Sequence, residues 1–347
     1  MAKHRFKPTR VVRNAAGLAI AAALIASCAP SGAQNEGGTK LNLVGFAVPK
    51  AGNNAAQAAF AKTSEGEGVT WTESYGASGD QSRAVAGGLD ADYVHFSITP
   101  DVTRLVNAGL VDQTWDDGPN KGIVTNSVVV LVVRKGNPKN IQGWDDLVKK
   151  GVGIVTPNPG SSGAARWNIL AAWQHVIAAG GSDADAKAFL ADLFANVEAL
   201  PGSGRDATAA FESGTGDVLI SYENEAILAR QLGEEIDYVV PTDTLLIENP
   251  AATLKNADEK ATDFLSFVLS AAGQSEYVSK GFRPLNSVPG VEVEKVDGAN
   301  DPSNPFPQPE ELFTIAADFG SWEEINDRFF DENNGIITKL LAESGKS

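Results

Sequence analysis

The feature that most limits how this chain can fold is the alternation, from Leu41 onward, of short apolar runs with longer amphipathic stretches. The apolar runs predict strands at 41–48, 69–76 and 91–98. The stretches after the first two strands predict helices at 53–63 and 78–89. Helices that follow successive strands are typical of an α/β domain with a mainly parallel sheet.

A second unit of the same kind opens near Ser127. Residues 128–134 are almost entirely valine, which is typical of a strand buried on both faces. The alternation then continues, with predicted strands at 151–157, 197–200 and 217–222 and predicted helices at 166–179 and 205–214.

The last third of the chain is less regular. We expect residues 237–253 to be extended chain broken by two prolines, 261–281 to be helical, 291–309 to be a Pro- and Asp-rich segment, and the rest to be helical as far as Leu341. A chain of 347 residues suits two compact domains of roughly 100–200 residues each. We place the break points between them near Ser127 and Pro241.

The first 27 residues have the pattern of a secretory signal. Lysine and arginine gather within residues 3–13, an apolar stretch of about a dozen residues occupies 15–26, and small residues precede Cys28. This stretch is too short to span a membrane, which takes about 20 apolar residues. We therefore predict that residues 1–27 are removed on export.

Cys28 is the only cysteine, so it cannot form an internal disulfide. Its position after the small residues resembles a bacterial lipobox, which implies cleavage before Cys28 and attachment of lipid to this residue. The alternative is ordinary secretion with an incidental cysteine. Residues 28–40 are polar and rich in Gly, Ser and Pro, which predicts a flexible tether between the lipid and the folded domain.

The charge of the exported chain excludes one class of partner. Removal of residues 1–27 takes away five Lys/Arg and no Asp/Glu, which leaves 23 basic and 44 acidic residues and a formal charge of −21. Nucleic acid is a poor partner for such a protein, because its binding depends on cations that neutralise phosphates. Any bound anion must be held by local donors, since the overall field repels it.

Three Gly/Ser-rich turns, at 76–79, 160–164 and 202–204, each follow a predicted strand and open a predicted helix. A helix N-terminus presents unpaired N–H groups and about half a positive charge. Glycine allows a ligand to approach the backbone, and serine adds a hydroxyl donor. One such turn is weak evidence because Ser and Gly also cap helices for structural reasons. Three of them predict an anion site at the carboxyl ends of the strands.

Catalytic machinery is not evident in the sequence. His4 lies in the signal, while His95 in a strand and His175 in a helix are more typical of core or surface positions than of ligands. The sequence has no zinc-type Cys/His cluster, no G-x-S-x-G turn, no Walker loop and no H-E-x-x-H motif. Plentiful donors without acid–base groups favour binding over turnover.

Six segments resemble periplasmic sulfate- and thiosulfate-binding proteins of ABC importers. They are SYGASGDQSRAV (74–85), VVRKGNPKNIQGWDDL (132–147), PNPGSSGAARWNILAAW (157–173), GDVLISYENEA (216–226), GFRPLN (281–286) and the FG-x-W element (319–322). The resemblance covers nearly the whole chain after the tether. Together with the lipobox, it is similar to actinobacterial sulfate-binding lipoproteins in particular.

The resemblance implies a two-lobe α/β fold of the type II periplasmic-binding-protein class, with the ligand in the interlobe cleft. Lobe one would comprise residues 41–126 plus 242–347, and lobe two residues 127–241. The implied activity is capture of sulfate or thiosulfate for the permease of an ABC importer. We expect a monomer without a cofactor or enzymatic activity, held at the outer face of the cell membrane by lipid on Cys28.

The family holds its dehydrated anion with hydrogen bonds alone. Carried onto this sequence, the implied donors are Ser78, Ser162, the backbone amides of Gly163, Ala164 and Ser203, the phenol of Tyr222, and an amide at about Ala47. Two donors depart from the family pattern. Tyr222 replaces a tryptophan but can still donate one hydrogen bond, and Ala164 replaces a glycine of which only the amide is needed.

Two aspartates keep other ligands under consideration. Asp80 and Asp206 stand where relatives carry lysine or a small residue. If either reached the ligand, it would repel sulfate and could accept the proton that phosphate carries at neutral pH. We expect both to point outward and to complement helix dipoles. The alternatives are a receptor for phosphate or a molybdate-type oxyanion, or a lipoprotein ester hydrolase.

Overall fold

The computed structural model describes residues 38–346. The predicted signal, Cys28 and most of the tether lie outside the described residues. No helix in the described part is both long and apolar enough to cross a membrane.

The first part of the sheet is parallel and covered on both faces. Strand β1 (Lys40–Phe46) lies between β2 (Thr70–Gly76) and β3 (Tyr93–His95). Side chains alternate along β1, so Leu43 packs in the cluster that contains Phe60 and Phe264, while Val44 packs with Val85. Helices α1 (Lys50–Phe60), α8 (Glu259–Val268) and α9 (Ala271–Val278) contribute to the first cluster, and α2 (Ser78–Ala86) and α3 (Thr99–Asn107) contribute to the second.

The second part of the sheet repeats this layering. Its strands, in sheet order after β4, are β7 (Val218–Tyr222), β5 (Ile154–Val155) and β6 (Val197–Ala199), and β8 (Ile236–Val239) pairs with β4. In β4 (Ile123–Arg134), alternate valines contact opposite layers, which confirms the predicted strand buried on both faces. The covering helices are α4 (Gly163–Ala178), α5 (Asp183–Ala195), α6 (Gly204–Glu212) and α7 (Glu223–Gln231).

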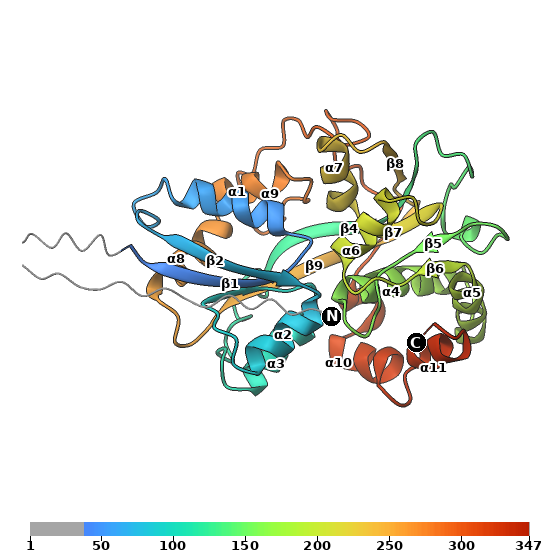
Figure 1. Cartoon of the computed structure of the whole chain (residues 1–347), viewed down its shortest axis with the longest axis horizontal. Coiled ribbons are helices and arrows are strands. Elements are labelled where there is room, and N and C mark those ends of the chain that lie inside the picture. The colour runs from blue at the N-terminus through green and yellow to red at the C-terminus, as the bar shows by residue number, and fades with distance from the viewer. Residues whose placement is uncertain (1–37, 347) are drawn as a thin grey trace, which may run out of the picture. The chain divides into compact units, whose positions relative to one another are not determined.

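Strands β4 and β9 (Asp243–Thr253) join the two parts (Figure 1). The first half of β4 pairs with β9 and its second half pairs with β7, so the predicted break near Ser127 falls inside a continuous strand. The expectation of extended chain broken by prolines is wrong for Pro250, which lies within β9 opposite a register shift between Ile123 and Thr125. A bulge accommodates a residue that has no N–H to donate.

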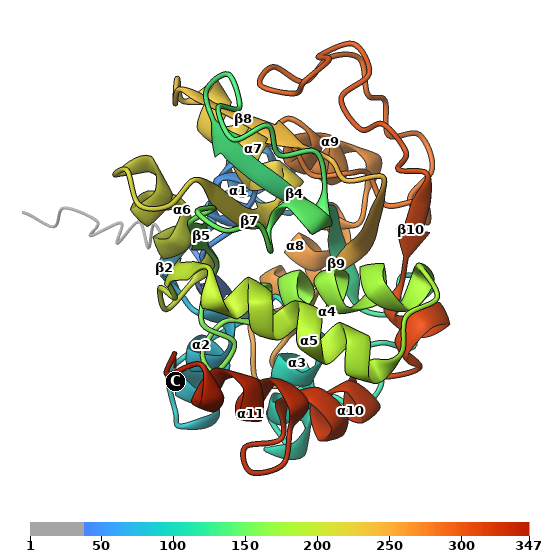
Figure 2. The ribbon, with the colours of Figure 1, turned by 90° about the vertical axis from the view of Figure 1, so that its right-hand side faces the viewer.

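The C-terminal segment lies along α4 and α5 (Figure 2). It contains β10 (Glu311–Phe313), a π-helical turn (Ile315–Phe319), α10 (Trp322–Ile325), a second π-helical turn (Asn326–Phe330) and α11 (Ile336–Glu343). Trp322 contacts Trp167, and Arg328 forms an ion pair with Asp183. Residues that we assigned to lobe one therefore contact helices assigned to lobe two, and the predicted division of the chain stays a prediction.

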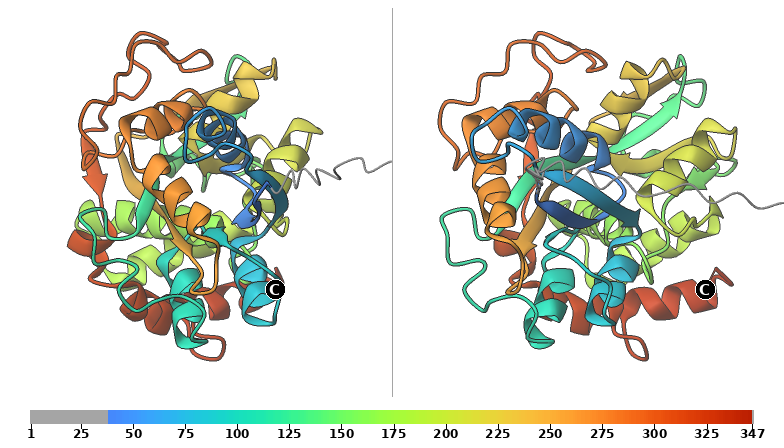
Figure 3. Two further views of the ribbon diagram at one scale, coloured as in Figure 1. Left: turned by 90° about the vertical axis from the view of Figure 1, so that its left-hand side faces the viewer. Right: turned by 60° about the vertical axis from the view of Figure 1, so that its left-hand side comes forward.

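Three helices were missing from the expected pattern, and one was too long. Helices α3, α5 and α7 were not predicted, and the single helix expected at 261–281 is two helices separated at Leu269 and Ser270. The hydroxyl of Ser270 accepts the Gly273 N–H and so starts α9 afresh. Between α9 and β10 the chain forms no helix or strand, and Figure 3 shows it as a long excursion along the outside.

Candidate functional site

The three Gly/Ser-rich turns begin helices α2, α4 and α6, as expected, and these N-termini meet. The Gly79 N–H at the start of α2 donates to the Ser161 carbonyl just before α4, at 3.1 Å. A Cβ placed on Gly204, the first residue of α6, would lie 3.4 Å from the Ala164 Cβ and 3.1 Å from Val48. Segments far apart in sequence therefore bring their N–H groups to one buried place.

Helix α4 supplies the most open donors. Ser162 is its N-cap residue, yet the Ser162 hydroxyl accepts no capping hydrogen bond. Within residues 38–346 this hydroxyl and the N–H groups of Gly163 and Ala164 have no protein partner, although all three residues are buried. Buried donors are nearly always paired, so these are the groups expected to hold a bound acceptor.

The serine of α6 has a different role from that of α4. The Ser203 hydroxyl accepts the Asp206 N–H at 3.1 Å and donates to the Asp206 carboxylate at 2.7 Å, so it serves as a structural cap. The Ser203 backbone N–H has no acceptor in the described part of the chain. This arrangement agrees with the expected contribution of the Ser203 amide rather than its side chain.

Ser78 at the start of α2 has its hydroxyl engaged. It donates to the Asp101 carboxylate at 2.6 Å and accepts the Ser97 N–H at 2.8 Å. Asp101 in turn pairs with Arg104 at 2.9 Å. The donor that Ser78 leaves open is its backbone N–H, which has no partner among the residues described.

Tyr222 ends β7 and is fully buried. Its phenol oxygen lies 2.8 Å from the Ser97 hydroxyl, and its ring is tilted against Phe46. Burial raises the pKa of Tyr222 well above its ordinary value, and side-chain hydrogen bonds from Ser97 and Asn249 offset only part of this effect. The phenol is therefore neutral at physiological pH and keeps a proton to donate.

The amide expected at about Ala47 already has an acceptor in the protein. The Ala47 N–H donates to the Gly76 carbonyl at 3.0 Å, which extends the pairing of β1 with β2. The next N–H, that of Val48, has no acceptor within the described chain. Val48 also lies beside Gly204, so the open amide of this loop faces the start of α6.

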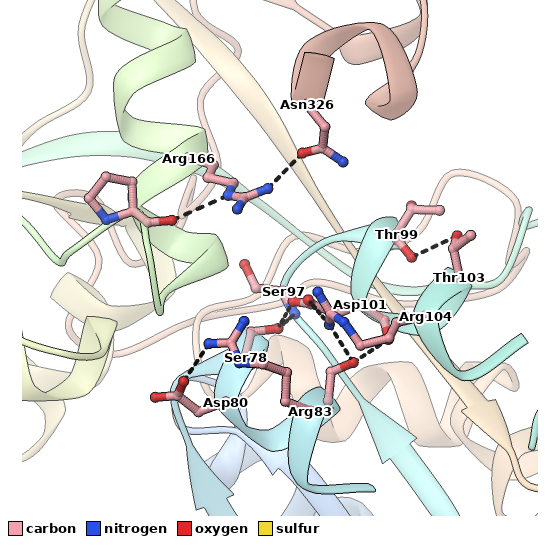
Figure 4. A network of polar contacts seen from close by, with 12 residues as sticks. Ser78, Asp80, Arg83, Ser97, Thr99, Asp101, Thr103, Arg104, Arg166 and Asn326 are labelled. Carbon is pink, nitrogen blue, oxygen red and sulfur yellow. Dashed lines mark hydrogen bonds and ion pairs between the residues drawn. The ribbon is translucent and has the colours of Figure 1, made fainter. Parts of the chain in front are cut away.

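The two aspartates that kept other ligands under consideration are both exposed. Asp80 pairs with Arg83 at 2.5 Å, and Asp206 is held by Ser203 as described above. Figure 4 shows Asp80 and Arg83 next to Ser78, with Asp101 and Arg104 to its right. None of the seven expected donors carries a charged side chain.

Arginines gather beside the site rather than in it. Arg83, Arg104 and Arg166 line a pocket of about 530 Å³ next to the loop at 158–160. Arg166 donates to the Asn326 side chain at 2.6 Å and to the Pro159 carbonyl at 3.4 Å. Asp101, Asp327, Asp331 and Glu332 also line it, so the pocket carries both signs of charge.

Three residues near the expected donors were not anticipated from the sequence: Ser97, Asp101 and Asn249. Ser97 lies two residues after β3 and near the end of the strand expected at 91–98, so a serine at the end of a predicted strand was the available signal. No sequence signal marked Asp101 or Asn249, because their roles depend on contacts between distant segments. Asn249 donates to the Ser97 carbonyl at 2.9 Å from strand β9.

Comparison with known proteins gives a consistent result. Residues 42–283 match the family model described as "Bacterial extracellular solute-binding protein". A sulfate-binding protein of Synechococcus elongatus is 39% identical, with 96% of this chain and 97% of that protein covered.

The chain belongs to the bacterial extracellular solute-binding proteins.

Other members of this family are similar over most of the chain. The sulfate-binding protein of Escherichia coli is 36% identical and the thiosulfate-binding protein of Pseudomonas aeruginosa is 34% identical, each with 83% of this chain and 87% of that protein covered. The structure of the sulfate-binding protein SubI from Mycobacterium tuberculosis superposes with a TM-score of 0.79 at 44% identity, over 84% of this chain and 100% of that one.

These relatives also establish the fold class. The periplasmic binding protein AfuA from Actinobacillus pleuropneumoniae matches with a TM-score of 0.63 at 19% identity, over 89% of this chain and 99% of that one, a likeness of fold alone. With SubI, it confirms the expected two-lobe α/β periplasmic-binding-protein fold. The curated relatives are named for the solutes they bind and not for a reaction.

Proposed function

We propose that this protein captures sulfate or thiosulfate outside the cell membrane and delivers it to the permease of an ABC importer. The names of the relatives support the ligand class, because sulfate- and thiosulfate-binding proteins match over more than four fifths of the chain. The donors we propose are Ser78, Ser162, Gly163, Ala164, Ser203 and Tyr222, together with the loop amide at Ala47 or its neighbour Val48.

The observation that carries the proposal is the unpartnered hydroxyl of Ser162 beside the open N–H groups of α4. Donors that converge in a buried place without a protein acceptor need an acceptor from outside. A tetrahedral dianion provides four oxygens that accept, and helix N-termini favour its charge. No lysine or arginine is required among the donors, since hydrogen bonds to a charged group are individually strong.

The chemistry of the donors favours sulfate over phosphate. Sulfate has no proton at neutral pH, whereas phosphate retains one and needs an acceptor for it. Asp80 and Asp206, which could have supplied that acceptor, are exposed and held by Arg83 and Ser203. Asp101 contacts Ser78 but is engaged with Arg104. A receptor for phosphate is thus the weaker alternative.

The pH dependence of binding tests this assignment. Sulfate does not titrate between pH 5 and 8, and burial lowers the pKa of His95, the nearest buried histidine, to about 3. We therefore expect sulfate affinity to stay nearly constant over this range when it is measured by calorimetry. Phosphate added at a concentration comparable to sulfate should not compete. Competition that follows the protonation of phosphate would overturn the assignment.

We also propose that lipid on Cys28 holds the protein at the outer face of the membrane. The basic head, the apolar stretch and the small residues before Cys28 support this proposal. Cys28→Ser should release the mature protein from the membrane fraction into the medium or periplasm, as followed by fractionation and immunoblotting. A variant with its signal removed that still sediments with membranes would contradict lipid anchoring at this residue.

An enzymatic function is the alternative from another class. A lipoprotein hydrolase of sulfate or phosphate esters needs a nucleophile, a base or a metal at the site. Incubation of the mature protein with a chromogenic sulfate or phosphate ester and divalent metals should release no product. Turnover that disappears in Ser162→Ala would support the hydrolase instead.

A further inference from the structure

Ser97 contacts several of the candidate donors, although it is not itself one of the expected donors. It lies between β3 and α3 and is fully buried. Its N–H donates to Ser78, and its hydroxyl is 2.8 Å from the Tyr222 phenol oxygen. A Cβ placed on Gly163 would lie 2.7 Å from the Ser97 Cβ. One residue therefore contacts three of the proposed donor segments, through its N–H and its side chain.

The backbone of Ser97 is held from two further directions. Its carbonyl accepts the Trp167 indole N–H at 3.0 Å and the Asn249 side-chain amide at 2.9 Å. Trp167 belongs to α4 and Asn249 to β9. Because both its N–H and its carbonyl are bonded, the backbone of Ser97 is fixed. Only rotation within the side chain can then redirect its hydroxyl.

Proton count decides what that hydroxyl does. Ser97 and Tyr222 each have one O–H proton, so only one of them can donate across the 2.8 Å contact. If Tyr222 donated to Ser97, the phenol would turn its lone pairs toward a bound anion, which is repulsive. If Ser97 donates to Tyr222, the phenol proton is left for the ligand, and the two hydrogen bonds strengthen one another.

We propose that Ser97 is the positioning residue of the site, and that its hydroxyl donates to Tyr222 so that the phenol proton points to the bound tetrahedral oxyanion. This inference rests on the proposed function. It adds a residue that need not touch the anion itself. An indole N–H can only donate, so a tryptophan at this position would need no partner to orient its proton. A tyrosine hydroxyl can also accept, and Ser97 would fix it as a donor.

A double-mutant cycle on sulfate affinity tests the inference. Ser97→Ala should weaken binding by about three- to tenfold and Tyr222→Phe by about ten- to a hundredfold, since the phenol contacts a charged group. The double variant should bind no more weakly than Tyr222→Phe alone, because Ser97 acts through the phenol. Equal losses from Ser97→Ala in both backgrounds would overturn the inference.

A matched control separates positioning from packing. Ser221 is also a buried serine, lies next to Tyr222 in β7 and points to the opposite face of the strand. Ser221→Ala should leave sulfate affinity unchanged within twofold. Thermal melts of each variant without ligand should show a folded protein, since each change removes one oxygen. A loss for Ser221→Ala as large as that for Ser97→Ala would also contradict a positioning role.

A spectroscopic measurement reads the phenol directly. The NMR shift of the tyrosine ring carbon that carries the hydroxyl reports on hydrogen bonding. With this carbon labelled, sulfate should move the Tyr222 signal in the wild type and move it clearly less in Ser97→Ala at saturation. An identical movement in both proteins would overturn the inference. Failure of the wild type to bind sulfate would instead reject the proposed function, so the two failures are distinguishable.

Discussion

At the scale of single residues, two serines in equivalent positions have different roles. Ser162 and Ser203 are both N-cap residues, at α4 and α6, but only the Ser203 hydroxyl accepts an N–H of its own helix. The local pattern is the same for both, because each follows a strand and precedes a helix, and only the family resemblance implied a side-chain donor at Ser162 and a backbone amide at Ser203. The difference arises from Asp206, which bonds the Ser203 hydroxyl, and from the lack of any such partner for Ser162 within residues 38–346.

This difference gives opposite expectations for two variants. Ser162→Ala should weaken sulfate binding by about ten- to a hundredfold and leave the melting temperature of the empty protein nearly unchanged. Ser203→Ala should lower the free energy of unfolding by about 1 kcal/mol because a cap is lost, with affinity largely retained through its backbone amide. Calorimetry and thermal melts of both variants check this, and unchanged affinity for Ser162→Ala would reject Ser162 as a donor.

His95 shows how burial decides the state of a residue. Its Nδ1 lies 3.0 Å from the Asn53 side-chain oxygen and its Nε2 lies 3.2 Å from the Thr125 hydroxyl, and the residue is fully buried at the end of β3. Burial lowers the pKa of His95 from 6.5 to about 3, so the ring is neutral in the folded protein. The sequence analysis expected a core or surface residue here, and the structure confirms a core position.

The depressed pKa of His95 gives stability that depends on pH. Its contribution is complete above pH 6.5, where the unfolded histidine is also neutral, and is lost as pH falls toward 3, because only the unfolded chain takes up the proton. Against His95→Gln, the stability advantage of the wild type should shrink by about 1.4 kcal/mol per pH unit between pH 6 and 4. Urea unfolding at several pH values checks this, and a constant difference would contradict the assignment.

At the scale of elements, hydrophobic periodicity predicted the strands better than the helices. The strands at β1, β4 and β7 were predicted because continuous apolar runs mark strands buried on both faces. Helix α7 was missed because its burial is not periodic: every residue from Glu223 to Ala229 is buried, and the first three of them are polar. Contacts with Arg205 and Arg283 compensate the two buried carboxylates, Glu225 and Glu223.

The ion pair between Glu223 and Arg283 connects α7 to the segment after α9. Arg283 contacts both carboxylate oxygens, at 2.6 and 3.0 Å, and both side chains are buried. Arg283→Met should lower the free energy of unfolding by about 3–5 kcal/mol, because a buried carboxylate loses its partner. Adding Glu223→Gln should recover much of this loss in denaturant titrations. A double variant as unstable as the single one would show that Arg283 acts by packing instead.

At the scale of the whole molecule, the sequence predicted the fold class and the turns that supply donors. It did not predict the contacts between distant segments that orient those donors. The three Gly/Ser turns could be recognised because each joins a strand to a helix. The contacts of Ser97 with Ser78, Tyr222 and Asn249 cross β3, α2, β7 and β9, and no local pattern predicts them. The division into lobes stays a prediction, since β4 and β9 run through both parts of the sheet.

The central claim is that buried, uncharged donors in a protein of strongly negative charge bind a fully deprotonated tetrahedral dianion. The most direct test is a calorimetric titration of the exported chain, which begins at residue 28 and carries Cys28→Ser. The titrants are sulfate, thiosulfate, phosphate and molybdate. We expect one saturable site for sulfate or thiosulfate per chain, and at least a hundredfold weaker binding of phosphate at pH 7. Phosphate binding as tight as that of sulfate, or no binding of either sulfur oxyanion, would contradict it.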